Sequence, residues 1–190
     1  MNNICLLAYL LSNKEVKQLI NEDVKRYLKW TNMDPSKSDY YRFKVCCKSR
    51  NFRNILYYRL KAGNRASRIL GKIASIVSPG FSTIEIGGKI GGGLLISHSF
   101  SITYVNTAGK NLRIGPGVVI GRSQKGFPTI GDNVYIAANS TVIGDLTIGD
   151  NVIIGAGTVV TKNIASNSVV VGNPARIIRK ICTDDYNEIM

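Results

Sequence analysis

The chain has 190 residues, of which 44% are hydrophobic, and a formal net charge of +13 at pH 7. This length fits one domain, or one domain with an appended module, and it can bury a substantial core without disulfides. The four cysteines, Cys5, Cys46, Cys47 and Cys182, show neither a CxxC pair nor metal-ligand spacing, which predicts reduced thiols in a cytosolic protein.

The positive charge is concentrated in the first part of the chain. Residues 1–83 carry 16 Lys plus Arg and 5 acidic residues, whereas residues 84–190 carry 9 and 7. An anionic membrane surface or glycolipid, a polyanionic substrate or nucleic acid could attract this region, or it could be a solvated basic face. Because no nucleic-acid-binding motif accompanies the charge, we expect no nucleic-acid partner.

Residues 1–80 are expected to form an α-helical module. The apolar run Ile4–Leu11 has no basic residue before it and no cleavage pattern after it, and it is too short to span a bilayer. We therefore expect a buried helix there rather than a signal peptide. Apolar residues recur at helical spacing over Leu19–Leu28, a loop follows at 32–38, and a second helical stretch is expected from about Tyr40 to Arg59.

A third helix is expected from Ala66 to Val77. Its aliphatic residues Ile69, Ile73 and Ile76 lie on one stripe at three- and four-residue spacing. Pro79-Gly80 then ends the helical module.

Beyond Ser82 the pattern changes to a six-residue repeat of aliphatic residues. The repeat runs in one register through Ile84, Ile90, Ile96, Ile102, Ala108, Ile114 and Ile120, and in a second through Ile130, Ile136, Val142, Ile148, Ile154 and Val160. Six residues do not match the helical turn, but they match a short strand followed by a corner. Ile and Val favour packed strands, whereas Gly, Asn and Asp tolerate the positive φ of tight corners. Stacking such coils builds a continuous aliphatic core.

The two registers are separated by an insertion. Ile130 follows Ile120 at a spacing of ten residues where six would suffice, and the four additional residues fall within 121–129. Because a stacked core has no room for them, we predict a loop that projects outward.

The repeat resembles the left-handed parallel β-helix of the hexapeptide-repeat acyltransferases, in which three hexads form one triangular coil. The resemblance implies a mainly β fold of a little over four coils at 81–175, after the helical module and before a C-terminal tail at 176–190. In that family, loops such as 121–129 commonly project beside the active site. Family members form trimers with active sites between neighbouring prisms, which implies a homotrimer or a hexamer here.

His98 is the only histidine in the chain. The stretch GGGLLISHSFSITYVN (91–106) resembles the region of the catalytic histidine in serine acetyltransferases and related polysaccharide O-acetyltransferases, which implies that His98 is the catalytic base. Imidazole is well suited to take the proton of an alcohol that attacks a thioester. No catalytic triad is evident, so direct transfer is expected. Ser97, Tyr104 and Asn106 flank this region and could orient the imidazole or the acceptor, although each could be purely structural.

The stretch IGAGTVVTKNIASNSVVVGNPARIIRK (154–180) closely resembles the terminal coil of acetyl-CoA-dependent members. This implies acetyl-CoA as co-substrate, with no metal. The positions that match residues along the coenzyme are Ala138 and Ala156 beside its pantetheine arm and Thr161, Lys162 and Arg176 at its nucleotide end. Cationic groups suit the coenzyme phosphates. Alternatively, the alanines serve only corner packing and Lys162 is solvated.

Three departures bear on the acceptor. Serine acetyltransferases, which this chain resembles, have an aspartate at the position of Ser97, an Arg-His pair at Gly126-Phe127 and a glycine at the position of Ser101. The first two differences remove charged groups that would hold an amino acid, and unpaired buried charge is costly. A neutral glycan acceptor is therefore favoured over L-serine.

We accordingly expect an acetyl-CoA-dependent O-acetyltransferase of a sugar or surface-polysaccharide precursor, in the cytoplasm or at the inner membrane face. The alternatives are a serine O-acetyltransferase of cysteine biosynthesis and a non-enzymatic trimeric scaffold. A metal-dependent hydratase of the same fold resembles a class that needs several histidines, so a single histidine disfavours it.

Overall fold

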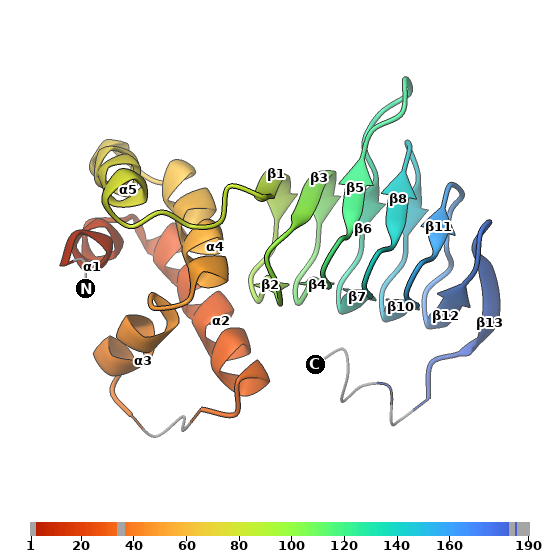
Figure 1. Ribbon diagram of the computed structural model, residues 1–190, viewed down its shortest axis with the longest axis horizontal. Coiled ribbons are helices and arrows are strands. Elements are labelled where there is room, and N and C mark those ends of the chain that lie inside the picture. Colours follow the sequence, from red (N-terminus) through yellow and green to blue (C-terminus); the bar gives the residue numbers. More distant parts are fainter. Residues whose placement is uncertain (1–2, 34–36, 183–184, 186–190) are drawn as a thin grey trace. The chain divides into compact units, whose positions relative to one another are not determined.

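The computed structural model describes residues 3–33, 37–182 and 185 (Figure 1). The chain forms two compact units, the first made of residues 1–82 with 92–95 and the second of residues 83–91 and 96–190. The first unit is helical, and the second is a parallel β solenoid of about five turns. The predicted mainly β fold with N-terminal helices is confirmed.

The described helices are α1 (Asn3–Leu10), α2 (Lys14–Trp30), α3 (Asp39–Cys46), α4 (Arg50–Lys61) and α5 (Arg65–Val77). The side chains of Asn13, Ser38, Ser49 and Asn64 cap the last four by accepting a backbone N–H three residues later. The single helical stretch predicted from Tyr40 to Arg59 is therefore wrong in extent, because Ser49 starts a new helix. Of the predicted loop at 32–38, residues 34–36 lie outside the described part.

A buried ion pair joins α2 to α4. Arg59 Nε and Nη2 donate to the two carboxylate oxygens of Asp23 at 2.8 and 3.0 Å, and both side chains are almost completely buried. Asp23 Oδ1 also accepts the backbone N–H of Leu94 at 2.8 Å, which ties the 92–95 segment into this unit. The pair sits within a core that includes Ile20, Phe52 and Leu56.

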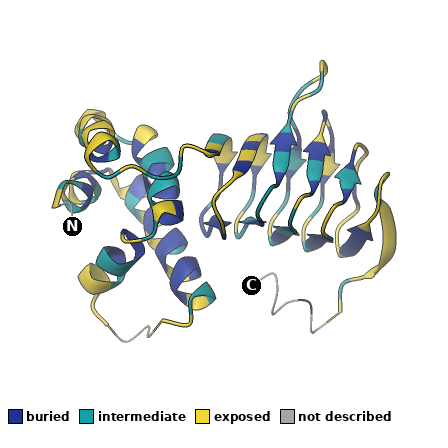
Figure 2. Ribbon diagram, viewed as in Figure 1, coloured by how far each residue is buried: buried dark blue, intermediate teal, exposed yellow. Residues whose placement is uncertain are grey.

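Large apolar residues on two helices of this unit are exposed, although amphipathic helices ordinarily direct such residues toward the core (Figure 2). In α5, Ile69, Ile73 and Ile76 are exposed, and the helix instead packs through its small residues at 67, 71 and 74. A Cβ on Gly71 would lie 3.0 Å from Leu60 Cβ, so close packing explains why the small side faces inward. In α1 only Cys5 and Ala8 are fully buried, so the predicted buried helix forms but leaves Leu7 and Leu10 exposed. No helix in the described ranges is long and apolar enough to cross a bilayer.

The described strands of the second unit are β1 (Ile84–Ile90), β2 (Leu95–Ile96), β3 (Ser101–Ala108), β4 (Arg113–Ile114), β5 (Val119–Gly121), β6 (Thr129–Ile130), β7 (Val134–Ile136), β8 (Thr141–Ile143), β9 (Thr147–Ile148), β10 (Val152–Ile154), β11 (Val159–Val160), β12 (Ser168–Val171) and β13 (Arg176–Lys180).

These strands stack into three faces. On the first face, the first half of β1 pairs with the first half of β3, which is followed by β5, β8 and β11. On the second face, the second halves of β1 and β3 pair with each other, and β6 and β9 follow. The third face is the sheet β2-β4-β7-β10-β12, on whose edge β13 runs antiparallel. The inward column of the third face, Ile96, Ile114, Ile136 and Ile154, has no exposed surface. Aliphatic side chains at every sixth residue thus build the core.

One repeat position does not point inward. Ile102 is 36% exposed, while its neighbour Thr103 is fully buried and pairs with Ile120. The prediction for Ile102 is wrong because the chain between Ile96 and β3 contains one residue too many for the six-residue register.

Asparagine forms the corners between the second and third faces. Asn111, Asn133, Asn151 and Asn167 have φ between 53° and 60°. The Nδ2 of each of the first three donates to the Oδ1 of the next asparagine in the stack, at 2.9, 3.0 and 2.9 Å. Asparagine tolerates this backbone conformation, and its amide can both donate and accept, so one residue type forms the turn and links the coils.

The insertion is placed between β5 and β6, where the connection projects beyond the other corners (Figure 1). Thr107 pairs with Thr129, 22 residues later, whereas Thr129 pairs with Thr147, 18 residues later. A hydrogen bond of 3.1 Å from the N–H of Ser123 to the carbonyl of Gly126 closes this loop.

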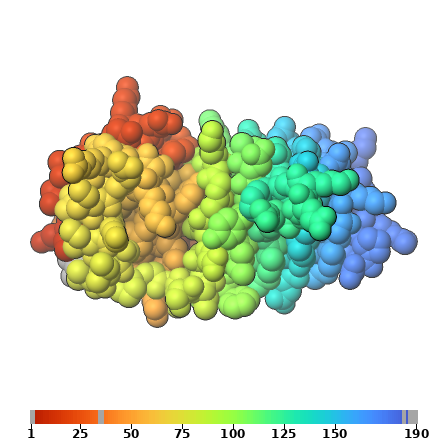
Figure 3. Space-filling model, turned by 90° about the horizontal axis from the view of Figure 1, so that it is seen from above, coloured from red at the N-terminus to blue at the C-terminus, as the bar shows by residue number. Residues whose placement is uncertain are grey.

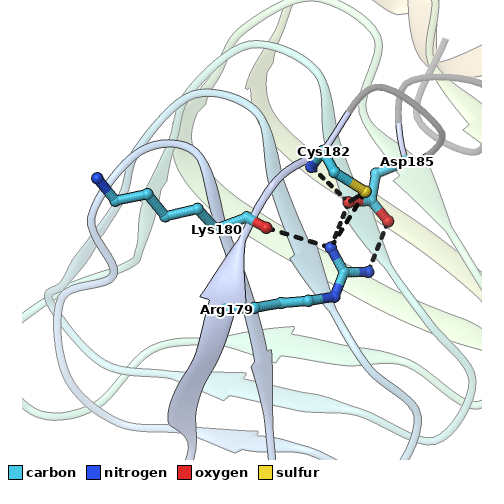
Figure 4. Close-up of polar contacts among 4 residues, drawn as sticks. All are labelled: Arg179, Lys180, Cys182 and Asp185. Carbon is cyan, nitrogen blue, oxygen red and sulfur yellow. Dashed lines mark hydrogen bonds and ion pairs between the residues drawn. The ribbon is translucent and has the colours of Figure 1, made fainter.

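An ion pair follows β13 near the end of the chain. Arg179 Nη2 donates to Asp185 Oδ1 at 2.7 Å, and the N–H of Cys182 donates to Asp185 Oδ2 at 2.8 Å (Figure 4). Of the expected tail at 176–190, residues 183–184 and 186–190 lie outside the described residues.

Candidate active site

His98 lies in the corner between β2 and β3, where the third face of the solenoid meets the first. The connections β4–β5, β7–β8 and β10–β11 form the same edge in later coils. Six residues separate Ile114 from Ile120, but seven separate Ile96 from Thr103, the residue that pairs with Ile120. The His98 corner therefore contains one residue more than the corners stacked beneath it.

Phe100 accommodates this additional residue with a left-handed backbone. Its φ is 91°, and its carbonyl accepts the N–H of Gly117 at 2.8 Å. The positive φ of the later corners falls on Gly117, Asn139 and Gly157, which are residue types that adopt it readily. A bulky residue in this conformation is an outlier, and such strain is concentrated at functional sites.

Ser97 anchors the chain immediately before His98. Its hydroxyl and its N–H both donate to the carbonyl of Ile114, at 3.2 and 3.1 Å, and the residue is buried. His98 itself is exposed at the outer surface. Ser97 thus fixes the backbone that presents the imidazole.

Ala138 and Ala156 lie on the same edge as His98. Each stands two residues after an inward isoleucine of the third face, as His98 does. The coils pack tightly here, since a Cβ on Gly115 would lie 2.8 Å from the backbone nitrogen of Ala138. Three strand spacings separate the His98 coil from the Ala156 coil, roughly 14 Å. This edge, which we call the track, carries an imidazole at one end and small side chains farther along.

Thr161, Lys162 and Arg176 come together around a hollow of about 370 Å³ at the far end of the solenoid. β13 folds back beside β12, so that Arg176 pairs with Val171 and comes near the residues that follow β11. The other residues that line the hollow are Asn163, Ile164, Pro174, Ala175 and Ile177. Lys162 and Arg176 are both exposed, so the hollow offers two solvated cations to an anion.

Tyr104 and Asn106 do not join the His98 corner. Three residues of extended β3 separate Ser101 from Tyr104, about 10 Å along the strand. The Nδ2 of Asn106 donates to Thr129 Oγ1 at 3.4 Å, which places this residue beside the end of the 121–129 loop. Of the three residues that could orient the imidazole or the acceptor, only Ser97 lies in the His98 corner.

The Tyr104 side chain is held in a defined position. Its hydroxyl donates to Glu85 Oε2 at 3.0 Å, and this hydrogen bond raises the pKa of the Tyr104 phenol. The ring lies over Gly87, where a Cβ would come within 2.5 Å of it, and 6.4 Å from the ring of Phe127 in the projecting loop. Two aromatic side chains thus lie near each other, one on β3 and one in the projecting loop.

Three residues of this site went unrecognised in the sequence. Glu85 and Phe100 have no local signal, because their roles depend on the neighbouring coil. Phe127 stands out only as a departure from a charged pair. Within the described ranges, no three His, Cys, Asp or Glu side chains are grouped closely enough to hold a metal ion.

The resemblance expected from the repeats is confirmed by comparison with known proteins. Residues 127–162 match the family described as bacterial transferase hexapeptide (six repeats). The chain is 42% identical over 113 residues to serine acetyltransferase 1, chloroplastic, of Arabidopsis thaliana, covering 56% of this chain and 36% of that protein. It is 38% identical over 128 residues to a serine acetyltransferase of Staphylococcus aureus, covering 63% of this chain and 60% of that one.

A solved structure extends the similarity to nearly the whole chain. The crystal structure of Neisseria gonorrhoeae serine acetyltransferase in complex with serine matches with a TM-score of 0.60 and 25% identity, over 92% of this chain and 73% of that one. The chain therefore spans only part of these relatives, 36% of the Arabidopsis protein and 60% of the Staphylococcus protein.

Proposed function

We propose that this chain, whose solenoid carries hexapeptide repeats and resembles serine acetyltransferases, is an acetyl-CoA-dependent O-acetyltransferase. The observation that carries the proposal is the position of His98. The only histidine stands in the enlarged β2–β3 corner, on the edge that continues through Ala138 and Ala156.

His98 acts as the general base. Its imidazole accepts the proton of the acceptor hydroxyl while the oxygen attacks the thioester carbonyl, and it returns that proton to the departing thiolate. The new C–O bond replaces the C–S bond, so that ester and free thiol are the products. A backbone N–H of the enlarged corner would be a suitable donor to the tetrahedral oxyanion.

The track and the hollow suit the two ends of acetyl-CoA. Small side chains at Ala138 and Ala156 leave room for an extended chain along the edge, and Lys162 with Arg176 would pair with phosphates. The hollow of about 370 Å³ fits only part of such a molecule, which leaves the thioester free to reach toward His98. A homotrimer, with active sites between neighbouring prisms, completes the proposal.

L-Serine is the acceptor that the comparisons favour, and it replaces the glycan as first candidate. The relatives are named serine acetyltransferases, and one of the similar structures holds serine. The glycan acceptor stays the second candidate, because Ser97 is neutral and bonded to the scaffold and the Tyr104–Phe127 pair offers aromatic surface instead of charge.

Thiol release from acetyl-CoA tests the proposal. The full chain is assayed with L-serine, with a panel of sugars and with no acceptor, and its thermal stability is measured with and without coenzyme A. Release that depends on L-serine supports the first candidate, and release that depends only on a sugar supports the second. If the chain shows neither thiol release nor thermal stabilisation by coenzyme A, the result would indicate the non-enzymatic scaffold.

A further inference from the structure

Helix α5 turns its most apolar side away from the protein. Ile69, Ile73 and Ile76 are 52%, 42% and 73% exposed, and Val77 at its end is 58% exposed. An amphipathic helix of a globular protein ordinarily directs such a stripe toward the core. This inversion leaves four large aliphatic side chains without cover.

Helix α1 enlarges the exposed surface. It packs against α5, and Asn64 Nδ2, at the start of α5, donates to the carbonyl of Leu11 at 2.7 Å. Leu7, Leu10 and Leu11 are 46%, 53% and 46% exposed. In Figure 3 the red atoms from the start of the chain border the yellow atoms of α5 on the surface of the helical unit. Together these side chains form the α1–α5 patch, defined as Leu7, Leu10, Leu11, Ile69, Ile73, Ile76 and Val77.

Cations border the α1–α5 patch. At 100° per residue, Arg65, Arg68 and Lys72 occupy the arc of α5 directly beside the isoleucines, and all three are exposed. α1, α4 and α5 contain no acidic residue at all. An outward apolar stripe with a basic border and no acids is the pattern of a helix that lies in a membrane interface.

The charge distribution argues against a second copy of this chain as the occupant. A symmetric contact through the α1–α5 patch would bring the Arg65, Arg68 and Lys72 side chains of two copies together, and α1 and α5 supply no carboxylate to offset them. Anionic lipid headgroups offset these charges directly, while the acyl region takes up the aliphatic side chains.

We propose that the α1–α5 patch docks this protein on the surface of an anionic lipid bilayer. The isoleucines of α5 and the leucines of α1 enter the interface, and the cations beside them contact the headgroups. The helical unit thereby holds the protein at a membrane without spanning it. The inference is independent of acetyl transfer.

Vesicle co-sedimentation of the full chain tests this proposal. We expect binding to phosphatidylcholine vesicles that contain phosphatidylglycerol to exceed binding to pure phosphatidylcholine on the order of tenfold or more, and to weaken with added salt. Ile73→Gln/Ile76→Gln should abolish binding to both, and Arg68→Gln/Lys72→Gln should remove only the preference for anionic vesicles. Ile177→Gln/Ile178→Gln, a comparably exposed pair on β13, is the matched control and should bind like the wild type.

Circular dichroism establishes that each variant is folded. Ile76→Gln alone, at the most exposed position, replaces the double variant if that does not fold. Wild-type protein that does not prefer anionic vesicles, or an isoleucine variant of α5 that still binds them, overturns the proposal. The proposal is also overturned if the wild type does not bind vesicles and the isoleucine variant of α5 has a lower mass than the wild type by sedimentation. The patch would then join copies of the chain.

Discussion

Thr103 pairs with Ile120, although the six-residue repeat assigns that inward position to Ile102. The shift of one residue originates in the corner that holds His98, and Phe100 accommodates it with a φ of 91°. The candidate base therefore sits where the solenoid departs from its own regularity.

Replacement of Phe100 by glycine should stabilise the protein. Glycine adopts positive φ without a steric penalty, and the Phe100 side chain is 56% exposed, so little burial is lost. We expect the free energy of unfolding to rise by about 1 kcal/mol in chemical denaturation. Phe127→Gly, at a position without positive φ, is the control and should not stabilise; equal gains for both would exclude backbone strain as the cause.

His98→Ala should lower kcat by roughly 10²- to 10⁴-fold, because the acceptor hydroxyl loses the group that takes its proton. The Tm should change little, since His98 is exposed. Steady-state thiol release with the preferred acceptor measures the effect, and Ser99→Ala in the same corner is the control. Near-normal turnover by His98→Ala would reject His98 as the base.

Lys162→Ala and Arg176→Ala should each raise the KM for acetyl-CoA by about tenfold, because each removes a cation that pairs with phosphate. The kcat should be nearly unchanged, since these residues lie far from the His98 corner. Saturation kinetics at fixed acceptor separate the two constants. Lys110→Ala, another exposed lysine of the solenoid, should leave both constants unaltered.

Asp23→Asn should destabilise the helical unit by about 3–5 kcal/mol, because it leaves the buried Arg59 guanidinium without its carboxylate. Urea unfolding followed by circular dichroism measures the loss. The pair of Asp39 and Arg42, whose carboxylate is almost fully exposed, provides the comparison, and Asp39→Asn should cost less than about 1 kcal/mol. Similar losses for the two variants would contradict the importance given to burial.

The ion pair at Asp185 should be visible as a pH effect. Hydrogen bonds from Arg179, followed by those from Cys182, hold the pKa of the Asp185 carboxyl well below its usual range. A lowered pKa means that the contact is intact above the ordinary aspartate pKa and is lost as the pH falls through the lowered one. Carboxyl NMR titration should show Asp185 ionised at pH values where other aspartates are protonated, and Arg179→Gln should return it to the ordinary range.

The solenoid could be predicted from the sequence because its rules are local. An aliphatic residue at every sixth position and asparagine at the corner describe one coil, and each coil contacts only the next, so Ile114, Ile136 and Ile154 were correctly expected to stack. The grouping of Thr161, Lys162 and Arg176 was expected only through resemblance, and it depends on β13 folding back beside β12.

The sequence by itself determined the repeat, the place of the insertion and the identity of the single imidazole. Only the tertiary structure decided which way α5 faces, since the close approach of Leu60 to Gly71 turns the small residues inward and the isoleucines outward. It also decided that Thr103 and not Ile102 lines the core, because the length of a corner is set by the coil stacked against it. Both outcomes follow from contacts between segments distant along the chain, which local periodicity does not encode.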